Sequence, residues 1–188
     1  MGYGLGMSQP EFDQYASQYQ EIHNKNLSQL GESSEFFDEH KVLELKDLLE
    51  QLGRAGQSLS LIDYGCGIGK TYPHMKRLLP AVSYLGVDLS SKSIEQAKLS
   101  HQNPAGFSVL SSDGSIPVAD QSVDIVFLAC VVHHIPPVER QKVFKEIFRV
   151  LKSQGFIFIV EHNPLNPATQ YIVRTCEFDD DAVLITAS

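Results

Sequence analysis

The glycine-rich segment Asp63-Tyr-Gly-Cys-Gly-Ile-Gly69 constrains the fold of this chain more than any other feature. It follows the apolar run Leu59-Ser-Leu-Ile62, and a second apolar run ends at Asp88, nineteen residues after Gly69. A strand, a tight glycine turn, a helix and a second strand closed by a carboxylate form a unit that holds a nucleoside-bearing cofactor at the carboxyl ends of parallel strands. The spacing predicts such a unit over residues 58–88.

The glycines and the second acid have separate physical roles. Gly65 and Gly67 permit backbone angles closed to residues with a Cβ, and they let a ligand lie against the bare backbone. We expect Gly69 to open the following helix, where free N–H groups and the helix dipole face the ligand. Asp88 can accept both hydroxyls of a ribose, each charge-assisted bond contributing roughly 1.5–3 kcal/mol.

The spacing of the glycines narrows the choice of ligand. Dinucleotide sites have the order G-x-G-x-x-G, and the last glycine stands one residue earlier here. Asp63 precedes the glycines, and its carboxylate would repel a pyrophosphate but attract an ammonium group. The pattern therefore favours a ligand with a cationic amino acid, while an NAD-dependent oxidoreductase stays an alternative.

With these residues the chain resembles the class I S-adenosylmethionine-dependent methyltransferases, from about Phe12 to the C-terminus. The resemblance implies a Rossmann-like α/β fold, with a doubly wound, mostly parallel sheet of strand order 3-2-1-4-5 and N-terminal helices. It implies S-adenosylmethionine as cofactor and S-adenosylhomocysteine as product. The motifs that carry it are, in order, 63–69, Tyr84–Ser90, Ser112–Pro117, Ser122–Phe127, His133–Pro136, Val143–Lys152 and Phe156–Val160.

The resemblance assigns a part of the donor to each motif. The glycine loop would face the methionyl end, the acid at the end of the second strand the ribose, and the loop after the third strand the adenine. An aromatic residue of the N-terminal helix would close over the donor. The predicted cofactor-binding residues are Asp63, Gly65, Cys66, Gly67, Gly69, Asp88, Leu89, Ser90, Ser112, Asp113, Gly114, Cys130 and Tyr19.

Structural roles are the alternatives for several of these residues. Asp63 can cap the amides of its own loop, and Asp113 can form an Asx turn before Gly114. Packing is the alternative for four more residues: Cys66, Cys130, Tyr15 and Tyr19.

His133 and His134 are candidate catalytic residues, because they follow the fourth predicted strand at the expected mouth of the site. A histidine there can take a proton from an acceptor O–H or N–H group. A shared structural role of the pair is the alternative. The segment Glu161-His-Asn-Pro164 is typical of a turn that ends a strand, and the sequence has no pattern that supports a metal site.

Alternating apolar strands and helical patterns predict one doubly wound domain. Residues 1–10 are expected to be a mobile tail, 11–53 a helical N-terminal lid and 58–188 the cofactor-binding core. Nearly all strand residues are apolar, which predicts a sheet buried on both faces. The predicted strands are 58–64, 82–88, 106–111, 123–130 and 155–161, and the predicted helices are 70–79, 91–101, 137–152 and 167–175.

The C-terminus departs from the family pattern. A complete domain of this family ends in an antiparallel hairpin beside the fifth strand, but only ten residues follow Phe178, with at most one strand over 182–186. We therefore expect a C-terminally truncated domain. An open fifth strand has unpaired N–H and C=O groups, so the tail, a swapped segment or a second copy in a homodimer is expected to cover it.

Composition limits the partners. A net charge of −8 over 188 residues argues against nucleic acid. Three scattered cysteines suggest a reducing, cytoplasmic setting, and the longest apolar run, 125–132, is too short for a membrane span. We predict methyl transfer to an O, N or C atom of a small-molecule acceptor. The main alternative is a protein that binds S-adenosylmethionine or S-adenosylhomocysteine without catalysis.

Overall fold

The computed structural model describes residues 34–166, 170, 183 and 184. Its helices are α3 (Ser34–Gln51), α4 (Tyr72–Leu78), α5 (Ser91–His101) and α6 (Pro137–Val150), with two 3-10 turns, η1 (Pro104–Gly106) and η2 (Val132–His134). Its strands are β1 (Ser60–Tyr64), β2 (Ser83–Asp88), β3 (Phe107–Val109), β4 (Val123–Ala129) and β5 (Leu151–Val160). The predicted alternation of strands and helices is confirmed.

The five strands form one parallel sheet in the order β3-β2-β1-β4-β5. This is the predicted order 3-2-1-4-5 and confirms the Rossmann-like fold. Asp63 of β1 is level with Gly86 of β2 and with Phe127 of β4. Because all the strands run the same way, their carboxyl ends meet at one edge of the sheet, where such folds bind ligands.

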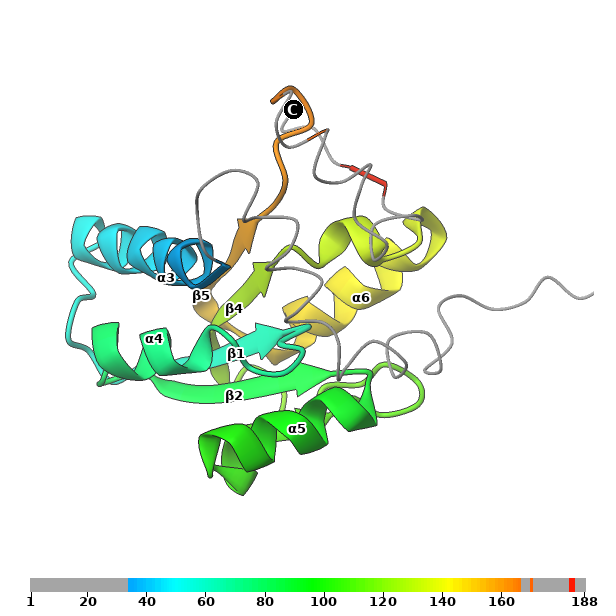
Figure 1. Ribbon diagram of the computed structural model, residues 1–188, viewed down its shortest axis with the longest axis horizontal. Helices are drawn as coiled ribbons and strands as arrows, with labels where there is room; N and C mark the ends of the chain where they lie inside the picture. Colours follow the sequence, from blue (N-terminus) through cyan, green and yellow to red (C-terminus); the bar gives the residue numbers. More distant parts are fainter. Residues whose placement is uncertain (1–33, 167–169, 171–182, 185–188) are drawn as a thin grey trace, which may run out of the picture.

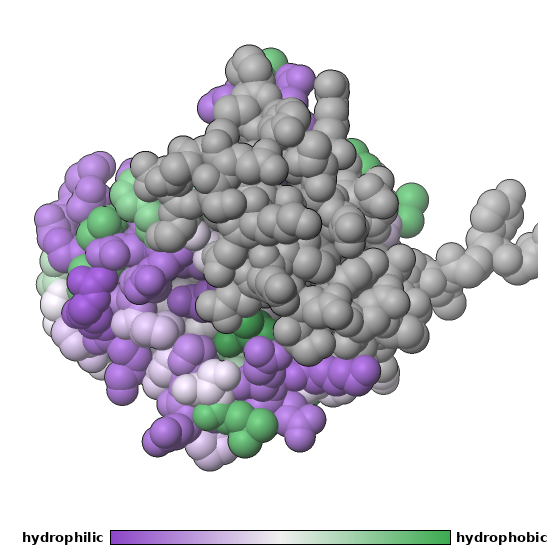
Figure 2. Space-filling view, in the orientation of Figure 1, coloured by the Kyte–Doolittle hydropathy of each residue, from purple (hydrophilic) through white to green (hydrophobic). Residues whose placement is uncertain are grey.

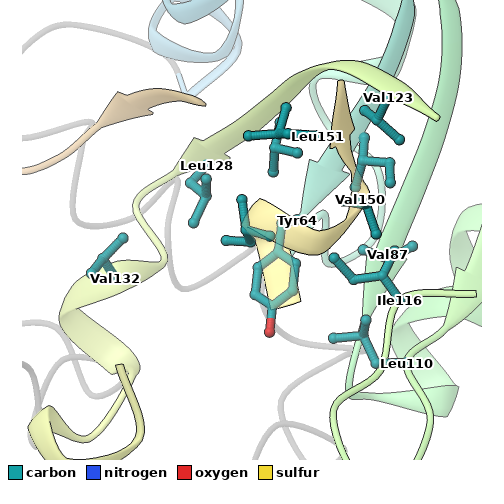
Figure 3. Packing of buried hydrophobic residues seen from close by; sticks show 12 residues of the cluster. Tyr64, Val87, Leu110, Ile116, Val123, Leu128, Val132, Val150 and Leu151 are labelled. Carbon is teal, nitrogen blue, oxygen red and sulfur yellow. The ribbon is translucent and has the colours of Figure 1, made fainter. Parts of the chain in front are cut away.

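Helices cover both faces of the sheet (Figure 1). Alternate residues of β1 point to opposite faces: Leu61 packs with α3 and α4, whereas Ile62 and Tyr64 pack with α6. Figure 3 shows the packing on the α6 side, where Tyr64, Val87 and Leu128 bring three strands together. The residues of β1 after Ser60 and the first six residues of β4 are all buried, which confirms the prediction of a sheet covered on both sides.

Helix α3 is an integral part of the core. Its apolar residues Val42, Leu45 and Leu49 are at most 1% exposed and pack against β1, β4 and β5. The surface formed by α3 and α4, at the left of Figure 2, is mostly hydrophilic, as expected for helices whose apolar side chains face a sheet. Within the predicted lid, 11–53, residues 34–51 are therefore a packed helix, and 11–33 lie outside the described residues. The tail 1–10 and most of the predicted helix 167–175 also lie outside them.

The fifth strand starts earlier than predicted. Leu151 pairs with Val123 and Phe156 with Ile125, so the strand bends between two registers. A Cβ on Gly155 would lie 3.0 Å from the backbone oxygens of residues 123 and 124, so only glycine fits at this bend without displacing them. Among the described residues β4 is the strand partner of β5. The predicted strand 182–186 lies largely outside the described residues, and Val183 and Leu184 are not in a strand.

No helix in the described part of the chain is long and apolar enough to cross a membrane.

We predict that Leu45→Ala destabilises the whole sheet domain, because it empties a fully buried position between α3 and the sheet. The expected loss in the free energy of unfolding is about 2–5 kcal/mol, measured by urea denaturation. Leu52→Ala is the matched control, since this side chain is 52% exposed, and it should change stability by less than about 0.5 kcal/mol. Equal effects of the two substitutions would show that α3 is not part of the core.

Candidate functional site

The carboxyl ends of β1, β2 and β4 bring the main predicted site residues together. The glycine loop follows β1, Asp88 is the last residue of β2, and Cys130 directly follows β4. The strands on either side of β1 are β2 and β4, and both end at predicted ligand-binding residues. The order of the sheet therefore places these motifs at one edge, as the sequence predicted.

Backbone amides hold the Asp88 carboxylate in a fixed orientation. Its Oδ2 accepts the N–H of Gly67 at 2.8 Å, and its Oδ1 accepts the N–H of Ser90 at 2.8 Å. The N–H groups of Gly65 and Cys66 donate to the Val87 carbonyl at 2.8 and 3.1 Å. Both carboxylate oxygens of Asp88 are thus held as hydrogen-bond acceptors at the end of β2.

The glycine loop has one packed side and one open side. Gly65 and Gly67 have φ angles of +74° and +53°, in the left-handed region that favours glycine. A Cβ on Gly65 would lie 2.6 Å from a methyl group of Val131, so this glycine lets the loop after β4 approach. A Cβ on Gly67 would meet no atom of the described residues within 4 Å. As far as these residues go, the Gly67 backbone is open beside Asp88, as a cradle for a ligand requires.

Gly69 does not open the helix, and this expectation was wrong. Its N–H donates to the Cys66 carbonyl at 2.9 Å, and α4 begins three residues later, at Tyr72. With φ at +75°, Gly69 is not helical, and it lies against the ring of Phe107. The amides of the turn itself, rather than a helix dipole, thus shape this part of the site.

Asp63 is a buried acid held by two hydroxyl groups. Its side chain is 2% exposed, and its Oδ2 accepts bonds from Thr71 Oγ1 at 2.5 Å and from the Tyr84 hydroxyl at 2.8 Å. These donors are side chains, not the loop amides expected from the capping alternative. Burial raises the pKa of Asp63 to about 6, against the lowering effect of both hydrogen bonds.

Cys66 is packed inside the loop. A Cβ on Gly86 of β2 would lie only 2.8 Å from the Cys66 Sγ. The glycine at this position therefore makes room for the thiol. Burial raises the pKa of Cys66 well above the ordinary value, which keeps the thiol protonated. These observations favour the packing role of Cys66.

The second and third motifs flank Asp88. Leu89 is 39% exposed, while Ser90 is buried and caps α5 by accepting the N–H of Ser93 at 3.1 Å. Asp113 accepts the N–H of Ser115 at 2.9 Å, which is the Asx turn expected as its structural alternative. Ser112 is exposed, and a Cβ on Gly114 would have no neighbour within 4 Å in the described part of the chain.

An ion pair of α6 fixes this loop. Glu146 accepts the N–H of Ile116 at 2.8 Å, and Arg149 donates to the carbonyls of Ile116 and Val118 at 3.1 Å each. Glu146 and Arg149 bind each other at 2.6 Å. This clamp was not predicted from the sequence, because its partners are some thirty residues apart.

The loop after β4 starts with an unusual backbone. Cys130 has a φ of +58°, and its N–H donates to the Val160 carbonyl at 2.8 Å. A non-glycine residue in this region is uncommon, and such residues gather at functional sites. The contact of the Cys130 backbone with a ligand stays a prediction.

Glu161 organises the same loop from the end of β5. Its Oε1 accepts the N–H groups of Val131 and Val132 at 3.0 and 2.7 Å, and its Oε2 lies 2.5 Å from His133 Nδ1. Burial alone would raise the pKa of Glu161, but the bonds from His133 and the two amides hold it below the ordinary value. The His133 side chain is 1% exposed, and the His134 ring lies 4.1 Å from it. This arrangement favours a structural role of His133.

A family model described as a methyltransferase domain matches residues 62–159, more than half of the chain. The chain belongs to this methyltransferase family. It is 30% identical over 126 residues to arsenite methyltransferase of Halobacterium salinarum, which covers 65% of this chain and 29% of the relative. It is 32% identical over 112 residues to malonyl-[acyl-carrier protein] O-methyltransferase of Hahella chejuensis, with coverages of 60% and 39%.

A solved structure has the same fold. Phosphoethanolamine N-methyltransferase 1 of Haemonchus contortus, in complex with phosphoethanolamine and S-adenosylhomocysteine, matches with a TM-score of 0.59 and 18% identity. The match covers 83% of this chain and 32% of that one. That structure holds S-adenosylhomocysteine, the product that the sequence analysis predicted for this chain's cofactor. The chain spans less than half the length of the relatives it matches.

Four supporting residues of the site were not predicted from the sequence: Thr71 and Tyr84, which hold Asp63, and the pair Glu146 and Arg149. Tyr19, the predicted lid residue, lies outside the described residues. In the described part of the chain, no group of three or more His, Cys, Asp and Glu side chains is arranged to hold a metal ion.

We predict that cofactor binding weakens below pH 6. The ionised Asp63 carboxylate would attract the ammonium group of the cofactor, and its pKa of about 6 means that the acid becomes protonated as the pH falls. Between pH 8 and pH 5 the Kd for S-adenosylhomocysteine should rise by about tenfold in calorimetric titrations.

Asp63→Asn should bind weakly at every pH in this range, without the pH dependence. If the variant retained the same pH dependence, the titrating group would be another one, and the assignment of Asp63 would be wrong.

Proposed function

We propose that this chain carries the cofactor site of a methyltransferase that acts on an O, N or C atom of a small molecule. The observation that carries the proposal is the Asp88 carboxylate, which the amides of Gly67 and Ser90 hold at the end of β2 beside the glycine loop. This arrangement fits a ribose with free hydroxyl groups. A ribose with a 2′-phosphate would be repelled.

The other motifs would bind the remaining parts of S-adenosylmethionine. Asp63 would face the ammonium group of the methionyl end, and the backbone of Cys130 would contact the same end. Leu89 and the turn around Asp113 would lie along the adenine. The Glu146–Arg149 pair keeps that turn in place for this contact.

Such a site can work without a catalytic base. The cofactor supplies a methyl group already activated by a sulfonium charge. The chain would mainly hold donor and acceptor in line and exclude water, and positioning of this kind can lower a barrier by several kcal/mol. His133 would then shape the loop after β4 through Glu161, and a proton transfer to His133 or His134 would be needed only for acceptors that lose a proton.

The acceptor is proposed to be small and not a nucleic acid, because the net charge is −8. The names of the relatives point to different acceptors, arsenite and malonyl-[acyl-carrier protein]. Acceptor contacts in this fold come from variable elements, so the shared core does not specify the acceptor.

A protein that binds the cofactor or its product without catalysis is the second candidate. For an acceptor that must lose a proton, the burial of His133 and its pairing with Glu161 favour this alternative, because they remove the predicted base from the surface of the site. Transfer of a labelled methyl group to any member of an acceptor panel would decide for the enzyme. An NAD-dependent oxidoreductase is disfavoured by the family match and by the Asp63 carboxylate beside the loop.

We predict that the chain binds S-adenosylhomocysteine and that Asp88→Ala weakens this binding by at least about tenfold, since two charge-assisted hydrogen bonds are lost. Isothermal titration calorimetry measures the effect, with NAD as a control ligand. Glu95→Ala removes an exposed acid from neighbouring helix α5 and should leave the affinity unchanged. Equal affinities of wild type and Asp88→Ala would contradict the proposed placement of the ribose.

We further propose that β5 is the contact edge of a cytoplasmic homodimer. The support is that, among the described residues, β5 pairs with one strand, β4. Light scattering after gel filtration should give the mass of two chains. A monomeric mass at micromolar concentration would contradict the proposal that a second copy of the chain covers the open edge of β5.

A further inference from the structure

Two polar side chains at the end of α5 contact the glycine loop and the residue that begins α4. His101, the last residue of α5, has its Nε2 3.2 Å from the carbonyl oxygen of Ile68. Asn103 donates from its Nδ2 to the hydroxyl of Tyr72, the first residue of α4, at 2.8 Å. The partners are 33 and 31 residues apart in the sequence, so the tertiary fold brings them together.

The peptide group between Ile68 and Gly69 is held at both of its polar atoms. Its carbonyl oxygen contacts His101, and its N–H donates to the Cys66 carbonyl at 2.9 Å. A carbonyl oxygen can only accept, so His101 Nε2 carries the proton of this bond. The Gly69 carbonyl in turn accepts the N–H of Tyr72 at 3.1 Å, which joins the loop to the start of α4.

Aromatic rings hold the imidazole of His101 in place. It is stacked on the ring of Phe107 with centroids 5.6 Å apart, and it lies 5.1 Å from the ring of Tyr72. A Cβ on Gly69 would be 2.7 Å from the Phe107 ring and 3.1 Å from His101 Cδ2, so the glycine lets the loop contact both rings. Packing therefore sets the position of the imidazole before a ligand binds.

The orientation of Asn103 depends on a neighbouring glycine. A Cβ on Gly106 would lie 2.2 Å from Asn103 Nδ2, so a larger residue would displace the amide from its bond to Tyr72. Gln102, with a φ of +50°, ends α5 between the two polar residues. This turn allows His101 and Asn103 to reach the same segment, residues 68–72.

We propose that His101 is a positioning residue for cofactor binding, because it holds the Ile68–Gly69 peptide in one orientation. The inference rests on the proposed function of the glycine loop as the cradle of the cofactor. Glycine adopts both signs of φ at little cost, so the peptide beside Gly69 can turn over once its carbonyl loses the donor. Such a turn would break the bond from Gly69 to Cys66 and change the shape of the loop. A peptide held in place beforehand lowers the entropy lost on binding.

Asn103 supports the same arrangement from the other end of the segment. Its bond to the Tyr72 hydroxyl fixes the ring beside which the imidazole of His101 lies. It also fixes the first residue of α4, whose N–H is bound to the Gly69 carbonyl. The two side chains thus hold the two ends of residues 68–72.

The test separates the hydrogen bond of His101 from the packing of its ring. His101→Phe keeps an aromatic ring between Phe107 and Tyr72 and removes the N–H donor, whereas His101→Gln keeps a donor and loses the ring. Wild type and variants are titrated with S-adenosylhomocysteine by calorimetry. Hydrogen exchange of the Gly69 amide is measured by NMR in the same chains without ligand.

We expect His101→Phe to weaken the binding by about threefold to tenfold, the range for the loss of one neutral hydrogen bond. Its Gly69 amide should exchange faster by a similar factor, since local opening of the loop becomes easier. His101→Gln should recover most of the affinity and of the protection. His40→Phe is the matched control, the same substitution at an exposed histidine of α3, and it should behave as wild type.

The wild-type chain alone gives a further test, because the nitrogen chemical shifts of an imidazole show which nitrogen carries the proton. The Nε2–H form is expected for His101. The Nδ1–H form would overturn the proposal without any variant, even if His101→Phe failed to fold.

Unchanged affinity or unchanged Gly69 exchange in His101→Phe would also overturn the proposal. Equal losses of affinity in His101→Phe and His101→Gln would do the same, since they would show that the ring and not the donor matters. If wild type does not bind S-adenosylhomocysteine, the proposed function fails and this inference fails with it. Binding by wild type and an equal affinity of His101→Phe reject the role of His101 alone, so the two failures are distinguishable.

Discussion

The hydrogen bond between the Gly67 amide and the Asp88 carboxylate is the contact on which the rest of the site depends. It joins the loop after β1 to the end of β2, and the other oxygen of Asp88 fixes the start of α5 through Ser90. The Val87 carbonyl strengthens the same junction by accepting two amides of the loop. The loop after β1, the end of β2 and the start of α5 are thus held in one arrangement before a ligand binds. This reduces the entropy that would be lost in ordering them on binding.

The two acids of the site have different environments and therefore different proposed tasks. Asp88 is bound by backbone amides, and its proposed ligands are the neutral hydroxyl groups of a ribose. Asp63 is buried below the loop, and its pKa of about 6 makes its charge depend on pH and on nearby cations. Lys41 of α3 is such a cation, and α3 is anchored to the sheet by Val42, Leu45 and Leu49. The hydrophobic core thereby positions the Lys41 charge, which is more than twenty residues before the glycine loop in the sequence.

The sequence predicted correctly those helices and strands whose ends are determined by neighbouring residues. The bounds of α5 agree with the prediction at both ends, because Ser90 is a strong N-cap and the helix ends before Gln102, which has a φ of +50°. The start of α4 was wrong because Gly69 is held outside the helical region by a bond within the turn. The hydroxyl pair on Asp63, the Glu161–His133 pair and the place of Lys41 were not predictable, since tertiary packing joins residues up to 28 positions apart in the first two cases and separate elements in the third.

The most direct test of the central claim is a crystal structure of the chain with S-adenosylhomocysteine. The account predicts that both ribose hydroxyls lie within hydrogen-bond distance of the Asp88 carboxylate, while the Gly67–Asp88 bond stays intact and the loop backbone keeps its shape. A ligand bound elsewhere, or a ribose that does not contact Asp88, would contradict the claim that this preset carboxylate is the centre of the cofactor site.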